Sequence, residues 1–139
     1  MFKRILLGYD GSEHSQRAAR IAGDLARRQT KTELWLVCAV DPIPSELGVP
    51  YMDQLIVERT RAGEELLKHA RELVGEKIPI HEELLFGSPA ESIMEIAENR
   101  SCDLIIMGTR GLGGLRGLLL GSQIQKVISL SECPVLAVK

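Results

Sequence analysis

Apolar residues gather in five short runs along the chain, and polar residues, glycine or proline bound each run. Runs of this length with few polar interruptions are typical of strands buried on both faces of a parallel sheet. The predicted strands cover residues 2–8, 33–40, 78–86, 103–107 and 134–138. No internal repeat and no linker interrupts the pattern, so it predicts one sheet.

The segments between these strands carry apolar residues three and four positions apart, the spacing of helices with one buried face. The first predicted helix begins after Ser12, a favourable N-cap, and places Glu13 at the positive end of the helix dipole. A proline-rich loop over residues 41–50 precedes a long helix that ends at Gly75. The last predicted helix covers residues 123–130.

The third helix has the strongest start signal in the sequence. Ser88 stands at the N-cap, Pro89 at the first helical position and Glu91 at the third. In such a capping box the serine hydroxyl accepts a hydrogen bond from a backbone N–H of the first turn, and the glutamate reaches back. We therefore expect the Ser88 side chain to cap this helix.

Strands alternating with helices predict an α/β fold, a Rossmann-like five-stranded parallel sheet with helices on both faces, in a single domain over residues 1–139. In doubly wound sheets the ligand binds at the carboxyl ends of the strands, where the strand order reverses. For the order 3-2-1-4-5 this crevice lies between the first and fourth strands. Asp10 and Gly108 stand at those strand ends. Because helical spacing follows Asp10, a strand-to-helix turn is favoured there over a hairpin.

Composition narrows the classes of partner. The chain is 45% hydrophobic and 26% charged with a net charge of −2, which gives no reason to expect nucleic acid or an anionic membrane. Neither a secretory signal nor a stretch of about 20 apolar residues is present, so we expect a cytoplasmic protein without a membrane span. The cysteines Cys38, Cys102 and Cys133 form no CxxC pair and are interpreted as buried, reduced thiols.

A glycine-rich run follows the fourth strand directly. It contains Gly108, then Gly111 after two intervening residues, and then Gly121-Ser122 after nine more intervening residues. Gly108 and Gly111 would allow the backbone to approach a ribose and a phosphate closely, and we expect backbone angles at Gly121 that favour glycine. Gly121-Ser122 would open a helix whose free N–H groups attract an anion, and Arg110 would supply positive charge.

Two common phosphate-binding motifs do not fit this run. A dinucleotide-binding GxGxxG starting at Gly111 would need glycine where Arg116 stands, and no glycine is followed by lysine as a Walker A loop requires. A plain surface loop is the remaining alternative to a phosphate site. His14 is interpreted as a solvated helix histidine, with a phosphate contact as its alternative. His69 and His81 lack metal-binding spacing, so no metal ligands are assigned.

The spacing of Gly108, Gly111 and Gly121-Ser122 resembles the nucleotide-binding motif of ATP-binding universal stress proteins. The opening ILLGYDGSEHS and the ending CPVLAVK resemble the two ends of the same family, so the similarity covers essentially the whole chain. The resemblance implies a five-stranded sheet of order 3-2-1-4-5, a homodimer, and ATP as the ligand. Mg²⁺ could accompany ATP, held through its phosphates.

The resemblance also implies a set of binding residues. From the adenine end to the phosphates they are Gly8, Asp10, Ala39, Val40, Met107, Gly108, Arg110, Gly111, Gly121, Ser122 and Gln123. The first two would lie at the adenine and the next two would form its apolar wall. Met107 and Gly108 would meet the ribose, and the remaining five would hold the phosphates.

The predicted role is regulatory, with ATP as a ligand, because no poised base, nucleophile or metal cluster indicates an enzyme. Two alternatives stay open. One is a slow ATP-hydrolysing or phosphoryl- or adenylyl-transferring enzyme on the same fold, although the SGGxDS and HIGH motifs of such enzymes are absent. The other is an interaction protein that binds no nucleotide.

The last strand, residues 134–138, should be an edge strand because nothing follows it in the sheet order. An exposed apolar edge is an aggregation hazard unless it is paired or covered. Antiparallel pairing of two copies of this strand would close a homodimer, as the resemblance also implies. A monomer with a shielded edge is the alternative. A lysine in place of Val138 is expected to oppose the pairing.

Overall fold

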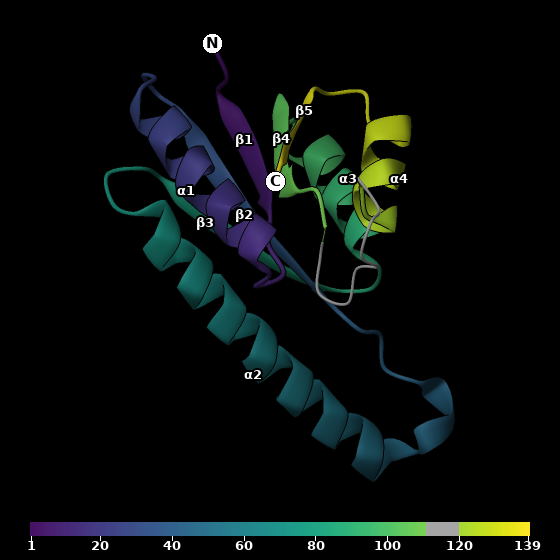
Figure 1. Cartoon of the computed structure of the whole chain (residues 1–139). Helices are drawn as coiled ribbons and strands as arrows, with labels where there is room; N and C mark the ends of the chain where they lie inside the picture. The colour runs from purple at the N-terminus through teal and green to yellow at the C-terminus, as the bar shows by residue number, and fades with distance from the viewer. Residues whose placement is uncertain (111–119) are drawn as a thin grey trace.

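The computed structural model of the protein describes residues 1–110 and 120–139. It contains a five-stranded parallel sheet of order β3-β2-β1-β4-β5, as the sequence predicts, with helices packed against it (Figure 1). The elements in chain order are β1 Arg4–Gly8, α1 Glu13–Arg27, β2 Glu33–Val40, the 3₁₀-helix η1 Ser45–Leu47, α2 Val49–Val74, β3 Ile80–Phe86, α3 Pro89–Asn99, β4 Leu104–Gly108, α4 Ser122–Leu130 and β5 Val135–Val138.

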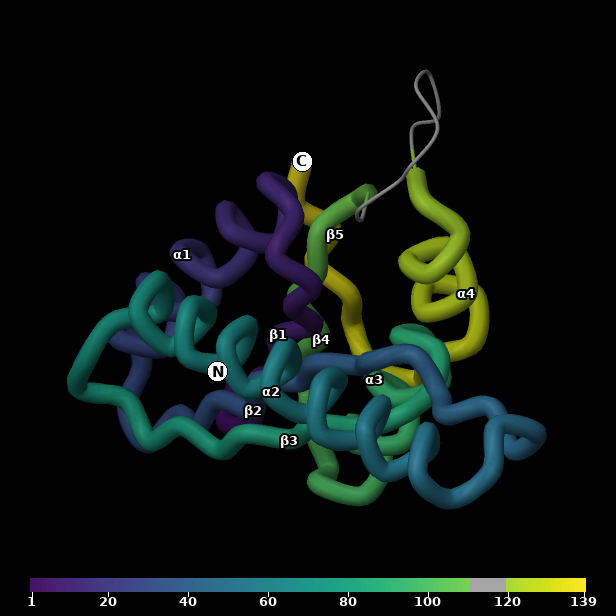
Figure 2. Tube along the Cα trace, turned by 90° about the horizontal axis from the view of Figure 1, so that it is seen from below, coloured from purple at the N-terminus to yellow at the C-terminus, as the bar shows by residue number. Residues whose placement is uncertain are grey.

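Two apolar clusters fill the space between the sheet and its helices, one on each face. Side chains from α1 and α2 pack on one face with strand residues such as Leu7 and Cys38, whereas α3 and α4 pack on the other with residues such as Leu6 and Val37. Figure 2 shows the backbone of the two pairs of helices on the two sides of the sheet. Alternate strand residues thus belong to opposite clusters, because successive side chains of a strand point to opposite faces. This alternation decides which residues can line a site on each face.

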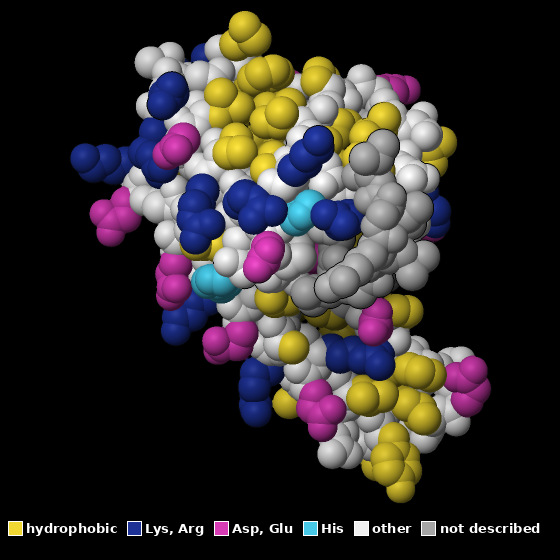
Figure 3. Space-filling view, in the orientation of Figure 1, with side chains coloured by type: hydrophobic (Ala, Val, Ile, Leu, Met, Phe, Trp, Pro, Cys, Tyr) yellow, Lys and Arg dark blue, Asp and Glu magenta, His cyan; other side chains and the backbone are white. Residues whose placement is uncertain are grey.

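Helix α2 begins earlier than the sequence pattern predicts. It starts at Val49, inside the expected loop, with Pro50 in its first turn, where the missing proline N–H costs no hydrogen bond. The start of α2 projects beyond the sheet in Figure 1, and Figure 3 shows apolar side chains gathered there. Val49, Tyr51 and Val57 are among the exposed ones. In residues 1–110 and 120–139, no helix is both long and apolar enough to cross a membrane.

Candidate functional site

A cavity of about 590 Å³ lies at the carboxyl ends of β1, β2 and β4, beside the starts of α3 and α4. This volume is within the range of about 300–1,000 Å³ that is usual for small-molecule sites. The cavity is at the place where the sheet topology predicts one. It is lined by nine of the residues expected from the sequence, namely Gly8, Asp10, Ala39, Met107, Gly108, Arg110, Gly121, Ser122 and Gln123.

Val40 is an exception, and its expected place in the apolar wall is corrected by the structure. Its side chain packs with the cluster beneath α1 and α2, on the face of the sheet away from the cavity. Ala39 and Val37 line the cavity instead, because alternate residues of β2 face the same side. Gly111 lies outside the described residues, so its expected phosphate contact has no structural counterpart here.

The turn between β1 and α1 holds the Asp10 carboxylate in place. Its Oδ1 accepts hydrogen bonds from the backbone N–H of Ser12 at 2.9 Å and from the Ser12 hydroxyl at 2.5 Å. The Ser12 hydroxyl in turn caps α1 by accepting from the N–H of Ser15. Gly11 makes the sharp turn with φ +84°, a conformation that favours glycine. The chain therefore turns from strand to helix here, as predicted, with Asp10 at the cavity.

His14 differs from the expectation of a solvated histidine. Its Nδ1 lies 2.8 Å from the Thr109 hydroxyl, so it joins the first turn of α1 to the end of β4. Burial, followed by the nearby cations Arg17 and Arg110, lowers the pKa of His14. A single sequence contains no signal for this contact, because the two residues are 95 positions apart.

Gly108 is needed for a reason that the sequence does not reveal. A Cβ built on it would lie 2.7 Å from the His14 Cβ and 2.9 Å from the backbone N of Ser15. Only glycine therefore lets the first turn of α1 pack against the end of β4. Gly8 is less constrained, because a Cβ there would meet the end of the flexible Ile93 side chain at 2.6 Å, and that side chain can move.

The start of α4 faces the cavity with its N-terminus. Gly121 is the N-cap and Ser122 the first helical residue. Gly121 has φ −72° and ψ 164°, which any residue adopts, so the expectation of angles that favour glycine is wrong. The free N–H groups of this helical turn remain suited to an anion.

Gln123 links α4 to α3 and changes the expected cap of α3. Its Oε1 accepts a hydrogen bond from the N–H of Ala90 at 2.9 Å, and this N–H lies in the first turn of α3. Ser88 is the N-cap, as predicted, but its hydroxyl makes no cap bond and has no partner among the described residues. The predicted capping bond from Ser88 is therefore wrong. The Gln123 side chain of α4 accepts a hydrogen bond from the first turn of α3 in its place.

The sequence patterns did not assign the α3 side of the cavity or Thr109. Pro89 and Ile93 of α3, together with Ile124 of α4, give the cavity an apolar wall. The apolar spacing that predicts α3 and α4 marks such residues only as core, because the same pattern serves core packing and a ligand wall. In the described ranges, no three His, Cys, Asp or Glu side chains gather as a metal site requires.

The comparisons of this chain with known proteins all point to the same family. The sequence profile of the universal stress protein family matches residues 1–139. A universal stress protein of Thermus aquaticus is 44% identical, and the match covers 100% of both chains.

Two solved structures are similar in both sequence and fold. The universal stress protein MJ0577 of Methanocaldococcus jannaschii is 32% identical with a TM-score of 0.85, over 100% of this chain and 96% of that one. A universal stress protein solved in complex with cAMP is 29% identical with a TM-score of 0.68, over 99% of this chain and 97% of that one.

Proposed function

Because the chain belongs to the universal stress protein family, we propose that it binds ATP in the cavity at the ends of β1, β2 and β4 as a cytoplasmic regulatory protein. The observation that carries this proposal is that one cavity has an apolar wall and, in the same lining, Arg110 and the N-terminus of α4. A related chain, 29% identical, was solved with the adenine nucleotide cAMP, which supports an adenine ligand.

The chemistry of the lining suits the two ends of ATP. Ala39, Met107 and Ile93 provide apolar contacts for a flat base. The N-terminus of α4 and Arg110 lie in the same cavity and would attract phosphates. Mg²⁺ bound with ATP would be held by the phosphates, and Asp10 and Asp41 are carboxylates in the lining that could add to its shell.

In this proposal ATP acts as a ligand, with no fast turnover. Hydrolysis needs a base that accepts a proton from a water molecule in line with the γ-phosphate. The Asp10 Oδ1 already accepts two hydrogen bonds from Ser12, which makes Asp10 better suited to fixing the turn than to serving as that base. A hydrolytic or transferase role therefore stays the alternative, as does an interaction protein without nucleotide.

Calorimetric titration of ligand-stripped protein tests the proposal. We expect one ATP to bind per chain and AMP to bind more weakly. The affinity for adenosine should be at least about tenfold lower than that for ATP, or about 1.4 kcal/mol. The reason is that adenosine brings no anion to the start of α4 and Arg110. Equal affinity for ATP and adenosine would show that the lining contains no phosphate site. Absence of binding by all three compounds would favour the interaction protein.

We also propose a homodimer that forms through β5. β5 is the last strand of the sheet order, and Leu136 is 38% exposed on it. Ile105 and Thr109 donate their N–H groups to the carbonyls of Pro134 and Val138. The N–H and C=O groups of Val135 and Ala137 consequently point away from β4, because these directions alternate along a strand.

The Ala137→Pro variant is expected to shift the dimer to monomer. Proline removes the outward N–H of an exposed residue and leaves the bonds to β4 intact. Sedimentation would show a fall from the dimer to the 15.3 kDa monomer, with an unchanged circular-dichroism spectrum. Val138→Lys is a poor probe, since Val138 is only 7% exposed in the cluster beneath α1. A wild type that is monomeric, or a dimer that is insensitive to Ala137→Pro, argues against this interface.

A further inference from the structure

Two of the three cysteines line a second cavity, of about 410 Å³, at the end of the sheet opposite to the candidate site. Cys102 lies two positions before Leu104, the first residue of β4, and Cys133 lies two positions before Val135, the first residue of β5. Both side chains pack with the same apolar cluster on the α3 and α4 face. The two thiols thus share one cavity and one cluster although they are 31 positions apart in the sequence.

The pairing of β4 with β5 brings these two positions together. The N–H of Ile105 donates to the carbonyl of Pro134 at 2.9 Å, which places the start of β5 beside the start of β4. Adjacent strands lie about 4.8 Å apart, and disulfides join Cα atoms roughly 4.4–6.8 Å apart. The register Ile105↔Val135, continued back by two positions, places Cys133 opposite Asp103, the chain neighbour of Cys102. An offset of one residue, about 3.3 Å along the strand, combined with the spacing across the strands still suits a disulfide.

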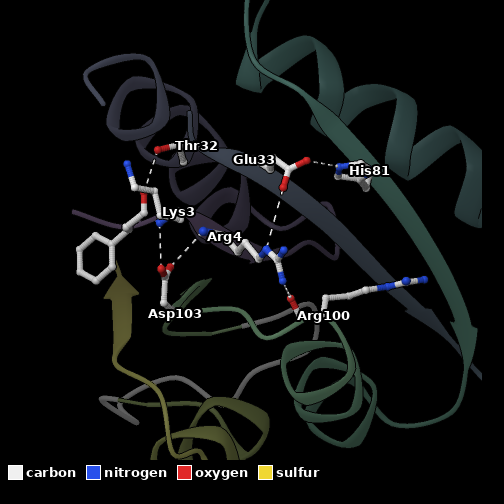
Figure 4. A network of polar contacts seen from close by, with 8 residues as sticks. Lys3, Arg4, Thr32, Glu33, His81, Arg100 and Asp103 are labelled. Atoms are coloured by element: carbon white, nitrogen blue, oxygen red, sulfur yellow. Dashed lines mark hydrogen bonds and ion pairs between the residues drawn. The ribbon is translucent and has the colours of Figure 1, made fainter. Parts of the chain in front are cut away.

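Hydrogen bonds hold the chain on both sides of Cys102. The Asp103 carboxylate accepts from the backbone N–H groups of Lys3 at 2.8 Å and of Arg4 at 3.1 Å (Figure 4). The Arg4 guanidinium donates to the Arg100 carbonyl at 3.0 Å. The segment that carries Cys102 is thus tied to the start of β1, so the backbone at Cys102 is held at the edge of the cavity.

Cys133 is held more locally and is more open to solvent. Its N–H donates to the Ser131 hydroxyl at 3.1 Å, and its sulfur lies 3.4 Å from the same oxygen. Cys133 is half-buried, whereas Cys102 is 8% exposed. A small reagent that enters the cavity therefore meets the Cys133 sulfur more readily.

We propose that Cys102 and Cys133 form a thiol-modification site, which a low-molecular-weight disulfide RSSR oxidises to an intramolecular disulfide. The Cys133 thiol loses its proton and its sulfur attacks RSSR, which forms a mixed disulfide and releases one RS⁻. The Cys102 thiol then loses its proton and its sulfur attacks the Cys133 sulfur, which releases the second RS⁻. The two protein thiols are oxidised and one RSSR is reduced to two RSH.

The environments of the thiols set this order of attack. Burial, followed by the neighbouring Cys133, raises the pKa of Cys102 to about 12. Its thiolate is therefore scarce at neutral pH, and Cys102 suits the second, intramolecular step better than the first. Cys38 cannot replace either thiol because it is fully buried in the cluster beneath α1 and α2, on the other face of the sheet.

The test treats the folded, full-length protein with oxidised glutathione, traps free thiols with N-ethylmaleimide after denaturation, and measures intact mass. We expect loss of two hydrogens, one alkylated cysteine, and a cross-linked peptide pair that contains Cys102 and Cys133. A lasting glutathione adduct on Cys133 without this cross-link would overturn the proposal. A dithiol peptide exposed to the same reagent serves as the positive control. If that peptide is oxidised while all three protein thiols are alkylated, the proposal is overturned as well.

Matched variants separate the two steps. Cys102→Ser should accumulate the glutathione adduct on Cys133, because the second thiol is gone. Cys133→Ser should give neither the adduct nor the cross-link at Cys102, whereas Cys38→Ser should behave as the wild type. If Cys102→Ser does not fold, the peptide map of the Cys38→Ser protein still decides whether the remaining pair is joined. Cross-linking of Cys38 in the wild type would contradict the assignment.

Discussion

Replacing Ala39 with tryptophan is expected to weaken ATP binding at least about 100-fold, or about 2.7 kcal/mol. Ala39 lines the cavity at the end of β2, on the side toward α3 and α4. An indole at this position would extend into the space of about 590 Å³ that we assign to the base. The fold should persist because the added atoms enter a cavity, where they displace no packed side chain.

An exposed alanine offers a matched control for this substitution. Ala62 lies on the solvent side of α2, so Ala62→Trp adds the same side chain without entering the cavity. Calorimetry should give wild-type affinity for Ala62→Trp and a large loss for Ala39→Trp, with similar melting temperatures for both. If folded Ala39→Trp binds ATP with an affinity within twofold of wild type, the adenine does not bind beside Ala39.

The second large effect is expected at Gly108, where Gly108→Val should lower the free energy of unfolding by about 3 kcal/mol. The new Cβ would lie 2.7 Å from the Cβ of His14 and 2.9 Å from the backbone N of Ser15. Backbone atoms cannot rotate aside as a flexible side chain can, so the first turn of α1 would have to move away from β4. ATP affinity should fall with stability, because this turn also holds Asp10.

Gly48 separates this steric cost from the general cost of replacing a glycine. A Cβ at Gly48 would meet nothing within 4 Å, although its φ is +78°. Gly48→Ala should therefore show only the backbone cost of φ 78° with ψ 161°, a conformation that essentially only glycine adopts, at roughly 1 kcal/mol, the lower end of the usual cost for such conformations. Urea denaturation measures both variants. Equal losses at the two positions would show that the contact between α1 and β4 adapts to a side chain.

The fold was predictable from the sequence because its signals are local and agree with one another. Apolar runs, helical spacing and the starts at Ser12 and Ser88 define elements whose alternation leaves few topologies. The cavity position follows from the same topology, which is why the sequence alone places Asp10 and Gly108 beside it.

Contacts between distant segments could not be predicted in this way. The contact of His14 with Thr109 depends on how closely α1 approaches β4. The bond from Ala90 to Gln123 depends on the packing of α3 against α4. Val40 was misplaced for a different reason. Its strand was correct, but in a strand buried on both faces the apolar pattern does not show which alternate residues face the ligand.

The most direct test of ATP binding in the cavity is a titration of isotope-labelled protein followed by amide chemical shifts. We expect saturable changes at Asp10, Ala39, Gly108 and Ser122, which border the cavity. The change at Ser122 should be larger with ATP than with adenosine, because phosphates would bind at the start of α4. Unchanged amides at saturating ATP, or changes gathered around Cys102 and Cys133, would contradict the proposed site.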